Sequence, residues 1–229
     1  MILHVLERAL SARNVARAIC ATDDRRVLDA VLSAGFEAVM TKATHASGSD
    51  RLAEVAATLD DAEVIVNLQG DEPLISPQTI ERAVDELLTD ATVQIVTTSE
   101  EIAEAADVLS ADVVKVVTGE AGRALYFSRS PVPFPRDAVR RYGTLLAALE
   151  LEPQLLASFR KHTGLYVYRR SFLLEYTRWP QSPLERAESL EQLRALERGV
   201  HIKVIEAESV SIGVDTEQDL ERVRKILEA

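Results

Sequence analysis

The sequence predicts an α/β fold with a doubly wound, mostly parallel sheet, and three observations lead to this prediction. Short apolar runs alternate with segments of helical periodicity along the first half of the chain. One of these runs, residues 63–68, is apolar almost throughout, as expected of a strand covered on both faces. The length of 229 residues fits one domain of this class. We therefore expect a single domain over residues 1–229, with a smaller lobe over about residues 118–200.

The first half of the chain follows a β-α-β-α-β order once an opening helix, residues 1–10, has been passed. Apolar runs predict strands at residues 15–21, 37–40, 63–68 and 92–97. Helical periodicity predicts helices at residues 24–34, 49–59 and 77–88, and Pro77 suits the first turn of the last of these. This order predicts parallel strands that are joined by right-handed crossovers.

The second half is less regular. A strand pair is expected at residues 113–117 and 124–127, joined through Gly119 and Gly122, and further strands at 162–168 and 202–206. Helices are expected at residues 171–176, 187–197 and 217–227. Between these elements, three alternating prolines forbid a helix and predict an extended loop: Pro131, Pro133 and Pro135.

Composition excludes several classes of function. The formal net charge of −11 argues against nonspecific nucleic-acid binding, which needs clustered cations. An anionic substrate would need local basic residues or a bound cation. The sequence contains no apolar run of about 18 residues, so no membrane span is predicted. The N-terminus lacks the features of a signal peptide. The single cysteine, Cys20, is predicted to be a buried structural residue. We therefore expect a cytoplasmic protein.

An acidic turn, Gln69-Gly70-Asp71-Glu72-Pro73, follows the most apolar predicted strand. Ligands of open α/β sheets bind outside the carboxyl ends of strands. Gly70 allows close approach of the backbone to a ligand, and Asp71 and Glu72 offer the hard oxygen ligands that Mg²⁺ prefers. The alternative interpretation is a turn with solvated acids.

A second acidic segment, Gly213-Val214-Asp215-Thr216, precedes the last predicted helix. Thr216 or Asp215 could be the N-cap of that helix. The functional interpretation makes Asp215 a second carboxylate for Mg²⁺. Both can hold together, with Thr216 as the cap and Asp215 turned toward the metal.

A polar loop ahead of a predicted helix carries Ser47, Gly48 and Arg51. Hydroxyls, a glycine and free helix N–H groups suit a base edge or an anion. Arg51 opposes the helix dipole in the first turn, which indicates a role other than helix stability. The alternative is a well-capped loop without a ligand.

Two segments of the second half could recognise a carboxylated sugar. Arg129, His162 and Tyr166 would suit this ligand if the fold brings them together, although a lone histidine is more often structural. The segment around residues 182–194 contains Glu191 and Gln192, and its alternative interpretation is a solvated helix face.

Taken together, these segments resemble the CMP-KDO synthetase family, the 3-deoxy-manno-octulosonate (KDO) cytidylyltransferases. The resemblance covers nearly the whole chain in one order, and its most specific motifs are QGDEP from Gln69, YFSR from Tyr126, LEQLR from Leu190 and GVDT from Gly213. It implies a Rossmann-like nucleotidyltransferase fold and a reaction that joins CTP and KDO into CMP-KDO and pyrophosphate, with Mg²⁺, for lipopolysaccharide biosynthesis. It also implies a homodimer.

The resemblance assigns a role to each candidate residue. Asp71 and Asp215 would hold Mg²⁺ and act in catalysis together with Arg129. The cytidine side would be bound by Ser47, Gly48 and Arg51. The sugar pocket would contain Gln69, His162, Tyr166, Glu191 and Gln192 as further substrate-binding residues. Two alternatives stay open: a cytidylyltransferase for another acidic sugar, such as a sialic acid, and a catalytically incomplete homologue that serves as a dimer scaffold.

The chain departs from the family pattern at its start. Family members carry a strand and a loop rich in Arg and Lys before the segment that matches His4-Val5-Leu6-Glu7-Arg8. We therefore expect the first strand of the sheet to be missing from this chain. A start assigned too late, a truncation or a naturally incomplete homologue would each produce this pattern.

Overall fold

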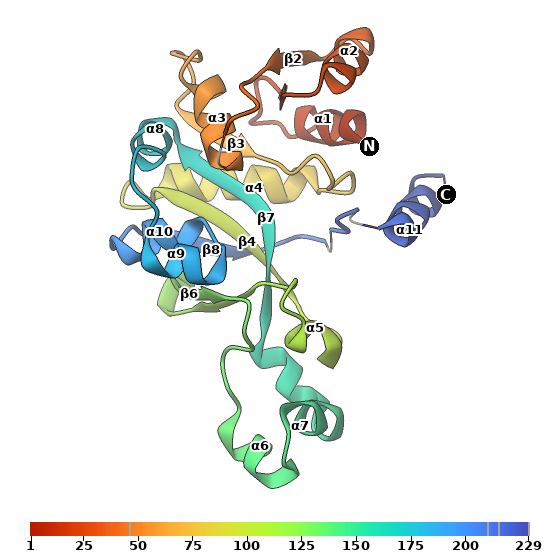
Figure 1. Ribbon diagram of the computed structural model, residues 1–229, viewed down its shortest axis with the longest axis vertical. Helices are drawn as coiled ribbons and strands as arrows, with labels where there is room; N and C mark the ends of the chain where they lie inside the picture. The colour runs from red at the N-terminus through yellow and green to blue at the C-terminus, as the bar shows by residue number, and fades with distance from the viewer. Residues whose placement is uncertain (46, 210, 215, 229) are drawn as a thin grey trace. The chain divides into compact units, whose positions relative to one another are not determined.

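A computed structural model describes residues 1–45, 47–209, 211–214 and 216–228 of the protein (Figure 1). The chain forms two compact units. The first unit comprises Met1–Ala91, Gly164–Arg178 and Ala207–Ala229, and the second comprises Thr92–Thr163 and Trp179–Glu206. The lobe expected over residues 118–200 falls in the second unit except for residues 164–178.

The first unit contains helices that follow strands in the predicted alternation. Its helices are α1 (Ile2–Leu10), α2 (Arg25–Ser33), α3 (Gly48–Ala56), α4 (Pro77–Thr89), α8 (Arg170–Tyr176) and α11 (Glu217–Leu227). Its strands are β1 (Ile19–Thr22), β2 (Glu37–Met40), β3 (Val64–Asn67) and the second part of β7 (Arg160–Arg169). β1 and β2 pair in parallel across the crossover helix α2, as predicted. β3 pairs with β7 in antiparallel register, from Val64 opposite Arg169 to Asn67 opposite Tyr166.

Side-chain caps determine where the helices of the first unit begin. Asp24, Ser47, Ser76 and Thr216 each accept a hydrogen bond from a backbone N–H in the first turn of α2, α3, α4 and α11. Pro77 occupies the first turn of α4, where its missing N–H is not needed. Thr216 is therefore the cap of the last helix, as one of the two interpretations predicted.

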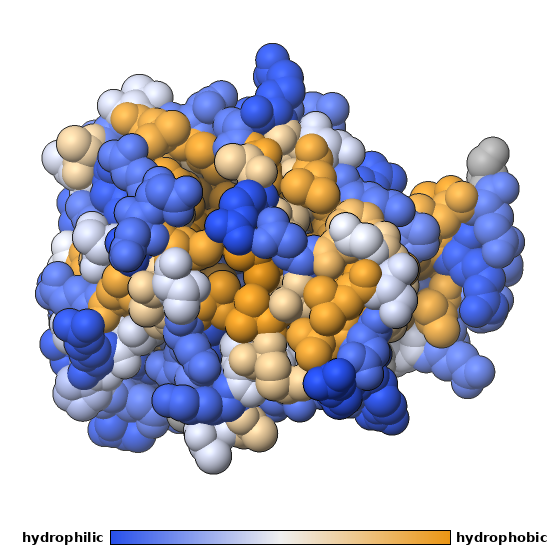
Figure 2. Space-filling view, turned by 90° about the horizontal axis from the view of Figure 1, so that it is seen from above, coloured by the Kyte–Doolittle hydropathy of each residue, from blue (hydrophilic) through white to orange (hydrophobic). Residues whose placement is uncertain are grey.

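A groove of about 340 Å³ lies in the first unit and is lined by both β1 and β3. Among the described residues, β1 pairs only with β2 and β3 only with β7, so each strand has one edge without a strand partner. Apolar side chains of three helices also line the groove: Ile2, Val5, Leu6 and Ala9 of α1, Leu52 of α3, and Ile80 of α4. Figure 2 shows apolar residues around a hollow in the face viewed from above. A further strand in this groove would have a pairing partner on each side, which the expected first strand requires.

The second unit is built on strands β4 (Ile95–Glu101), β5 (Lys115–Thr118), β6 (Ala124–Ser128), β8 (Ile202–Glu206) and the first part of β7. The strand order is β6-β5-β7-β4-β8. β4 and β8 pair in parallel, whereas β5 is antiparallel to β6 and β7. The protein is thus an α/β protein with parallel pairs in both units, and its sheet also contains antiparallel pairs at β5, β6 and β7.

The helices of the second unit differ from the sequence-based expectation in three places. The single helix predicted over residues 187–197 is wrong, because the chain forms α9 (Pro183–Glu188) and α10 (Gln192–Glu197) instead. Ser189 ends α9 in the left-handed region, with φ of 52°, and breaks the periodic pattern. The proline-rich loop is followed by two short helices that were not predicted, α6 (Arg136–Tyr142) and α7 (Leu145–Leu151), and α5 (Ala105–Leu109) was also missed.

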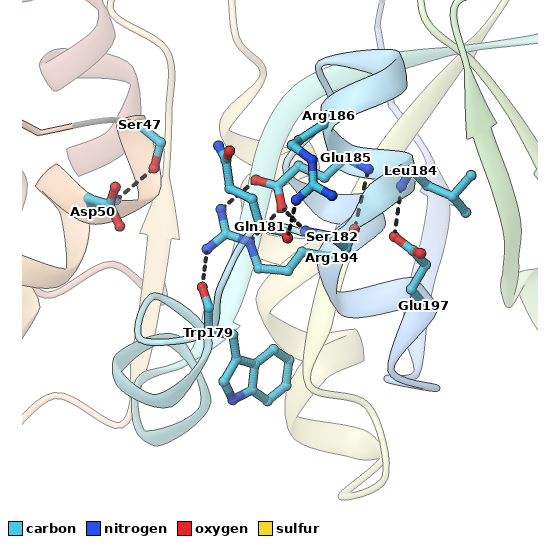
Figure 3. Close-up of polar contacts among 10 residues, drawn as sticks. All are labelled: Ser47, Asp50, Trp179, Gln181, Ser182, Leu184, Glu185, Arg186, Arg194 and Glu197. Atoms are coloured by element: carbon cyan, nitrogen blue, oxygen red, sulfur yellow. Dashed lines mark hydrogen bonds and ion pairs between the residues drawn. The ribbon is translucent and has the colours of Figure 1, made fainter.

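A buried ion pair joins α9 to α10 (Figure 3). Arg194 donates from Nε to Glu185 Oε2 at 2.8 Å and from Nη2 to Glu185 Oε1, and the two side chains are only 5% and 3% exposed. Arg194 Nη1 donates to the carbonyl of Trp179 at 3.3 Å. Glu185 also completes a capping box with Ser182. Burial acts to raise the pKa of Glu185, but the hydrogen bonds from Arg194 and from the Ser182 N–H outweigh it, and the pKa is lowered.

None of the described helices is both long enough and apolar enough to cross a bilayer.

From the groove we predict that one added strand would raise the thermal stability of the protein. A strand-forming extension ahead of Met1 should pair with both β1 and β3 and raise the thermal midpoint by at least about 5 °C, since 1 kcal/mol corresponds to ~2–4 °C in a chain of this size. Differential scanning calorimetry measures this shift. The control is the same extension with alternate residues replaced by proline, which removes backbone donors. Equal midpoints for the two extended chains would contradict the prediction.

From the buried pair of Glu185 and Arg194 we predict that a single substitution lowers the unfolding free energy much more than the double substitution does. Glu185→Leu leaves the Arg194 guanidinium buried without its carboxylate and should cost about 3–5 kcal/mol of unfolding free energy. The double variant Glu185→Leu with Arg194→Met should recover most of this loss. Urea denaturation monitored by circular dichroism measures both. Glu221→Gln, which breaks the exposed pair of Glu221 and Arg224, is the control and should change stability by less than about 0.5 kcal/mol. A double variant no more stable than the single one would contradict this account.

Candidate active site

The acidic turn lies directly after β3 and is pressed against a glycine of β7. The backbone N–H of Glu72 donates to the carbonyl of Gln69 at 3.3 Å, which closes the turn. A Cβ atom added at Gly164 would lie 2.8 Å from Gln69 Cγ and 2.8 Å from Glu72 Oε1. The register of β3 and β7 explains this proximity, because the pairing of Asn67 with Tyr166 places Gln69 beside Gly164. A larger residue at position 164 would therefore require the side chains of Gln69 and Glu72 to move.

Asp71 is held by its backbone, and its side chain is available to a ligand. The carbonyl of Asp71 accepts a hydrogen bond from the N–H of Val214 at 2.9 Å. Its carboxylate, which is half-buried, has no hydrogen-bond or ion-pair partner within the part of the chain that is described. Asp215, the predicted second metal ligand, lies outside the described residues. The bond from Val214 nevertheless brings the segment before Asp215 to the backbone of Asp71.

The loop before α3 is anchored from both ends. Ser47 accepts a hydrogen bond from the N–H of Asp50 at 3.2 Å, so this residue caps α3. Arg51 donates from Nη1 to Thr41 Oγ1 at 2.6 Å and from Nη2 to Asp23 Oδ2 at 2.9 Å. The hydrogen bond from Arg51 lowers the pKa of Asp23. Asp23 therefore accounts for a cation in the first turn of α3, where the helix dipole disfavours it.

The groove of the first unit brings together three of the predicted substrate-binding residues. Gly48, Arg51 and Gln69 line it, and Gly70 lies beside them. Its volume of about 340 Å³ falls in the range of small-molecule sites, which begins at about 300 Å³. Its polar end thus contains a helix N-terminus, a guanidinium group and a side-chain amide. Tyr166 also belongs to this unit and lies opposite Asn67, with its ring stacked 5.8 Å from that of Tyr168.

His162 lies in the second unit and is held neutral. Its Nε2 is 2.9 Å from Thr97 Oγ1, and its ring meets the edge of Phe127 at 5.1 Å between centroids. Burial lowers the pKa of His162 to about 3. The imidazole is therefore uncharged at neutral pH and can offer a ligand a hydrogen bond but no positive charge.

The guanidinium of Arg129 is engaged by backbone carbonyls. It donates from Nε to Glu188 O at 2.8 Å, from Nη1 to Ala111 O at 2.9 Å and from Nη2 to Ser189 O at 3.5 Å. The predicted catalytic role of Arg129 remains a prediction, and these contacts favour a role in holding the surrounding backbone.

Gln192 stands out among the predicted sugar-binding residues. It begins α10, directly after Glu191, and is only 6% exposed. Its Nε2 makes no hydrogen bond to any described residue. An amide left in this state costs about 1–3 kcal/mol, so its donor is available to a ligand oxygen.

Asp23, which orients Arg51, and Lys115, whose ammonium group donates to the carbonyl of Arg129 at 2.6 Å, were not among the candidates. Lys115 carried a usable signal, because it is a single charge within the apolar run Val113-Val114-Lys115-Val116-Val117. Asp23 gave no such signal, since its partner Arg51 is distant in the sequence.

Comparison with known proteins agrees with this geometry. The sequence profile of the cytidylyltransferase family matches residues 1–205. The 3-deoxy-manno-octulosonate cytidylyltransferase of Trichlorobacter lovleyi is 49% identical over 98% of this chain and 87% of its own length. The enzyme of the same name from Solibacter usitatus is 48% identical over 100% of this chain and 84% of its own length.

Solved structures show the same fold. The structure of CMP:2-keto-3-deoxy-manno-octonic acid synthetase complexed with CTP superimposes with a TM-score of 0.86 at 41% identity, over 99% of this chain and 87% of that chain. A 4-diphosphocytidyl-2C-methyl-D-erythritol synthase from Anaerococcus prevotii, 14% identical with a TM-score of 0.58 over 100% of this chain and 86% of that one, shares the fold alone. The predicted Rossmann-like nucleotidyltransferase fold is thereby confirmed, and the chain belongs to the 3-deoxy-manno-octulosonate cytidylyltransferase (CMP-KDO synthetase) family.

Proposed function

We propose that this protein transfers the cytidylyl group of CTP to KDO and supplies CMP-KDO for lipopolysaccharide biosynthesis. The anomeric oxygen of KDO forms a bond to the α-phosphorus of CTP, the bond from that phosphorus to the β-phosphate oxygen breaks, and the hydroxyl proton is released. Pyrophosphate leaves with the electron pair of the broken bond. The observation that carries the proposal is the acidic turn at Asp71, held at the carboxyl end of β3 in a chain 49% identical to a KDO cytidylyltransferase.

The polar end of the groove is the proposed site for the cytidine side of CTP. The N-terminus of α3 offers backbone N–H groups at Gly48, and Ser47 fixes where this helix begins. Arg51 is oriented by Asp23 and Thr41, so it lies in a defined position before a nucleotide binds. Gln69, which the resemblance assigns to the sugar pocket, lines the same groove with a side-chain amide that can both donate and accept.

Mg²⁺ fits the residues at the acidic turn. Asp71 presents a carboxylate that is free of protein partners in the described chain, and its backbone is bonded to the residue before Asp215. Two carboxylates together with phosphate oxygens form the hard-oxygen set that Mg²⁺ prefers. When bound, the ion would neutralise part of the phosphate charge. Asp71 and Asp215 are the residues that would hold it.

The second unit and β7 contain the proposed KDO-binding groups. Neutral His162 and the buried amide of Gln192 can donate hydrogen bonds to sugar oxygens. Glu191 and Tyr166 complete the proposed set. Arg129 would act on the substrate carboxylate only if it exchanged its backbone carbonyls for that group.

A CTP- and KDO-dependent pyrophosphate release assay tests the function, with a sialic acid as the competing acidic sugar. Release with KDO and not with sialic acid is the expected result. Release with sialic acid alone would support the other acidic-sugar activity. No release with either sugar, from a folded chain, would favour a catalytically incomplete homologue. We also propose a homodimer located in the cytoplasm.

Asp71→Asn should lower kcat on the order of 100-fold or more, because an amide is a much weaker Mg²⁺ ligand than a carboxylate. The thermal midpoint should stay within about 2 °C, since the Asp71 carboxylate makes no hydrogen bond or ion pair with a described residue. The assay is pyrophosphate release over a Mg²⁺ titration. Asp61→Asn removes an exposed carboxylate of the same unit and is the matched control. Near-normal turnover in Asp71→Asn would remove Asp71 from the metal site.

Gln192→Met should raise KM for KDO about 10-fold or more while leaving KM for CTP within about twofold, because it removes a donor to the sugar. Its unfolding free energy should be unchanged or increased, since a buried amide without a partner for Nε2 is replaced by an apolar side chain. Gln181→Met changes an exposed glutamine of the same unit and serves as the control. A loss of stability with no change in either KM would show that Gln192 is structural.

A further inference from the structure

A fully buried lysine lies in the second unit outside the residues assigned above. Lys115 is 0% exposed, at the start of β5. Its ammonium group donates to three backbone carbonyls: Ser110 O at 2.7 Å, Val113 O at 2.6 Å and Arg129 O at 2.6 Å. These three bonds use all three of its protons. Burial lowers the pKa of Lys115, as expected of a cation held by neutral acceptors.

One of the three acceptors is the carbonyl of Arg129. The backbone N–H and the guanidinium of Arg129 also make hydrogen bonds. The guanidinium of Arg129 reaches back to Ala111, in the same loop as the first two acceptors of Lys115. It also reaches forward to the carbonyls of Glu188 and Ser189. Lys115 and Arg129 therefore tie the loop before β5, the end of β6 and the end of α9 together.

The carboxylate of Glu188 also belongs to this hydrogen-bond network. Its carboxylate accepts from Arg129 N at 2.9 Å, from Ser128 Oγ at 2.7 Å and from Tyr126 OH at 3.4 Å. Burial acts to raise the pKa of Glu188, yet the hydrogen bonds from Arg129 and Ser128 outweigh it and the pKa is lowered. The carboxylate is thus ionised at neutral pH and accepts from both the backbone and the side chains of β6.

The chain turns sharply just after Glu188. Ser189 adopts φ of 52°, a conformation that costs a non-glycine residue about 1 kcal/mol or more unless its surroundings hold it. The hydrogen bonds at Glu188 and the carbonyl of Ser189 hold this turn. Two residues later come Glu191 and Gln192, whose positions the turn determines.

We propose that Lys115 is a positioning residue for the sugar half of the site: its ammonium group fixes Arg129, and Arg129 and Glu188 fix the left-handed turn that presents Glu191 and Gln192. This proposal rests on the proposed function, which assigns those two residues to KDO. It also gives Arg129 a role that requires no contact with substrate.

Lys115→Met, which keeps an unbranched apolar stem and removes the ammonium group with its three bonds, tests the proposal. We expect KM for KDO to rise about 10-fold or more with KM for CTP within about twofold, because small displacements of binding groups cost up to about 100-fold. Hydrogen exchange of the amides at residues 189–194 should become at least about 10-fold faster. Arg136→Gln removes an exposed cation of α6 in the same unit and should leave both measurements unchanged.

A second variant, Glu188→Gln, weakens the same network at its less buried end and should give the same pattern if Lys115→Met does not fold. Unchanged exchange at residues 189–194 in the folded variants would overturn the proposal, and so would an equal rise of KM for both substrates. If the unsubstituted chain turns over no KDO, the proposed function fails, whereas the exchange experiment still decides whether Lys115 and Glu188 hold the turn.

Discussion

The antiparallel register of β3 and β7 is the constraint on which the candidate site depends. It pairs Asn67 with Tyr166 and so brings the acidic turn against Gly164, where a larger residue would displace the side chains of Gln69 and Glu72. Asp71 is then fixed at the end of β3, where Val214 bonds to its carbonyl. A ten-residue strand that also carries His162 into the second unit thereby sets the positions of groups far apart in the sequence.

Much of the fold could be predicted from local patterns, and the failures have physical causes. β2 and β8 lie where alternation and apolar content predicted them, over residues 37–40 and 202–206. The prediction of one helix over residues 187–197 was wrong because periodicity cannot reveal a left-handed residue such as Ser189, which distant hydrogen bonds hold in place. The antiparallel partner of β3 could not be predicted either, since it lies about a hundred residues further along the chain.

The candidate site could likewise be predicted from the sequence only where its features are local. The acidic turn is a local motif, and its residues were identified from the sequence. The contacts of Arg129 were not, because its partners come from two distant segments, and a sequence shows a guanidinium without showing what it binds. The neutral state of His162 likewise depends on burial by Phe127 and its neighbours, which only the fold determines.

The one cysteine of the chain lies in a useful place. Cys20 lines the same groove as Arg51 and Gln69, and burial raises the pKa of its thiol. A thiol of this kind reacts slowly with an alkylating reagent, because little thiolate forms and access is limited. With a single sulfhydryl group in the sequence, every labelled molecule reports on that one cavity. The protein therefore contains a native chemical probe of groove opening, and a point of attachment for covalent ligands directed at this groove.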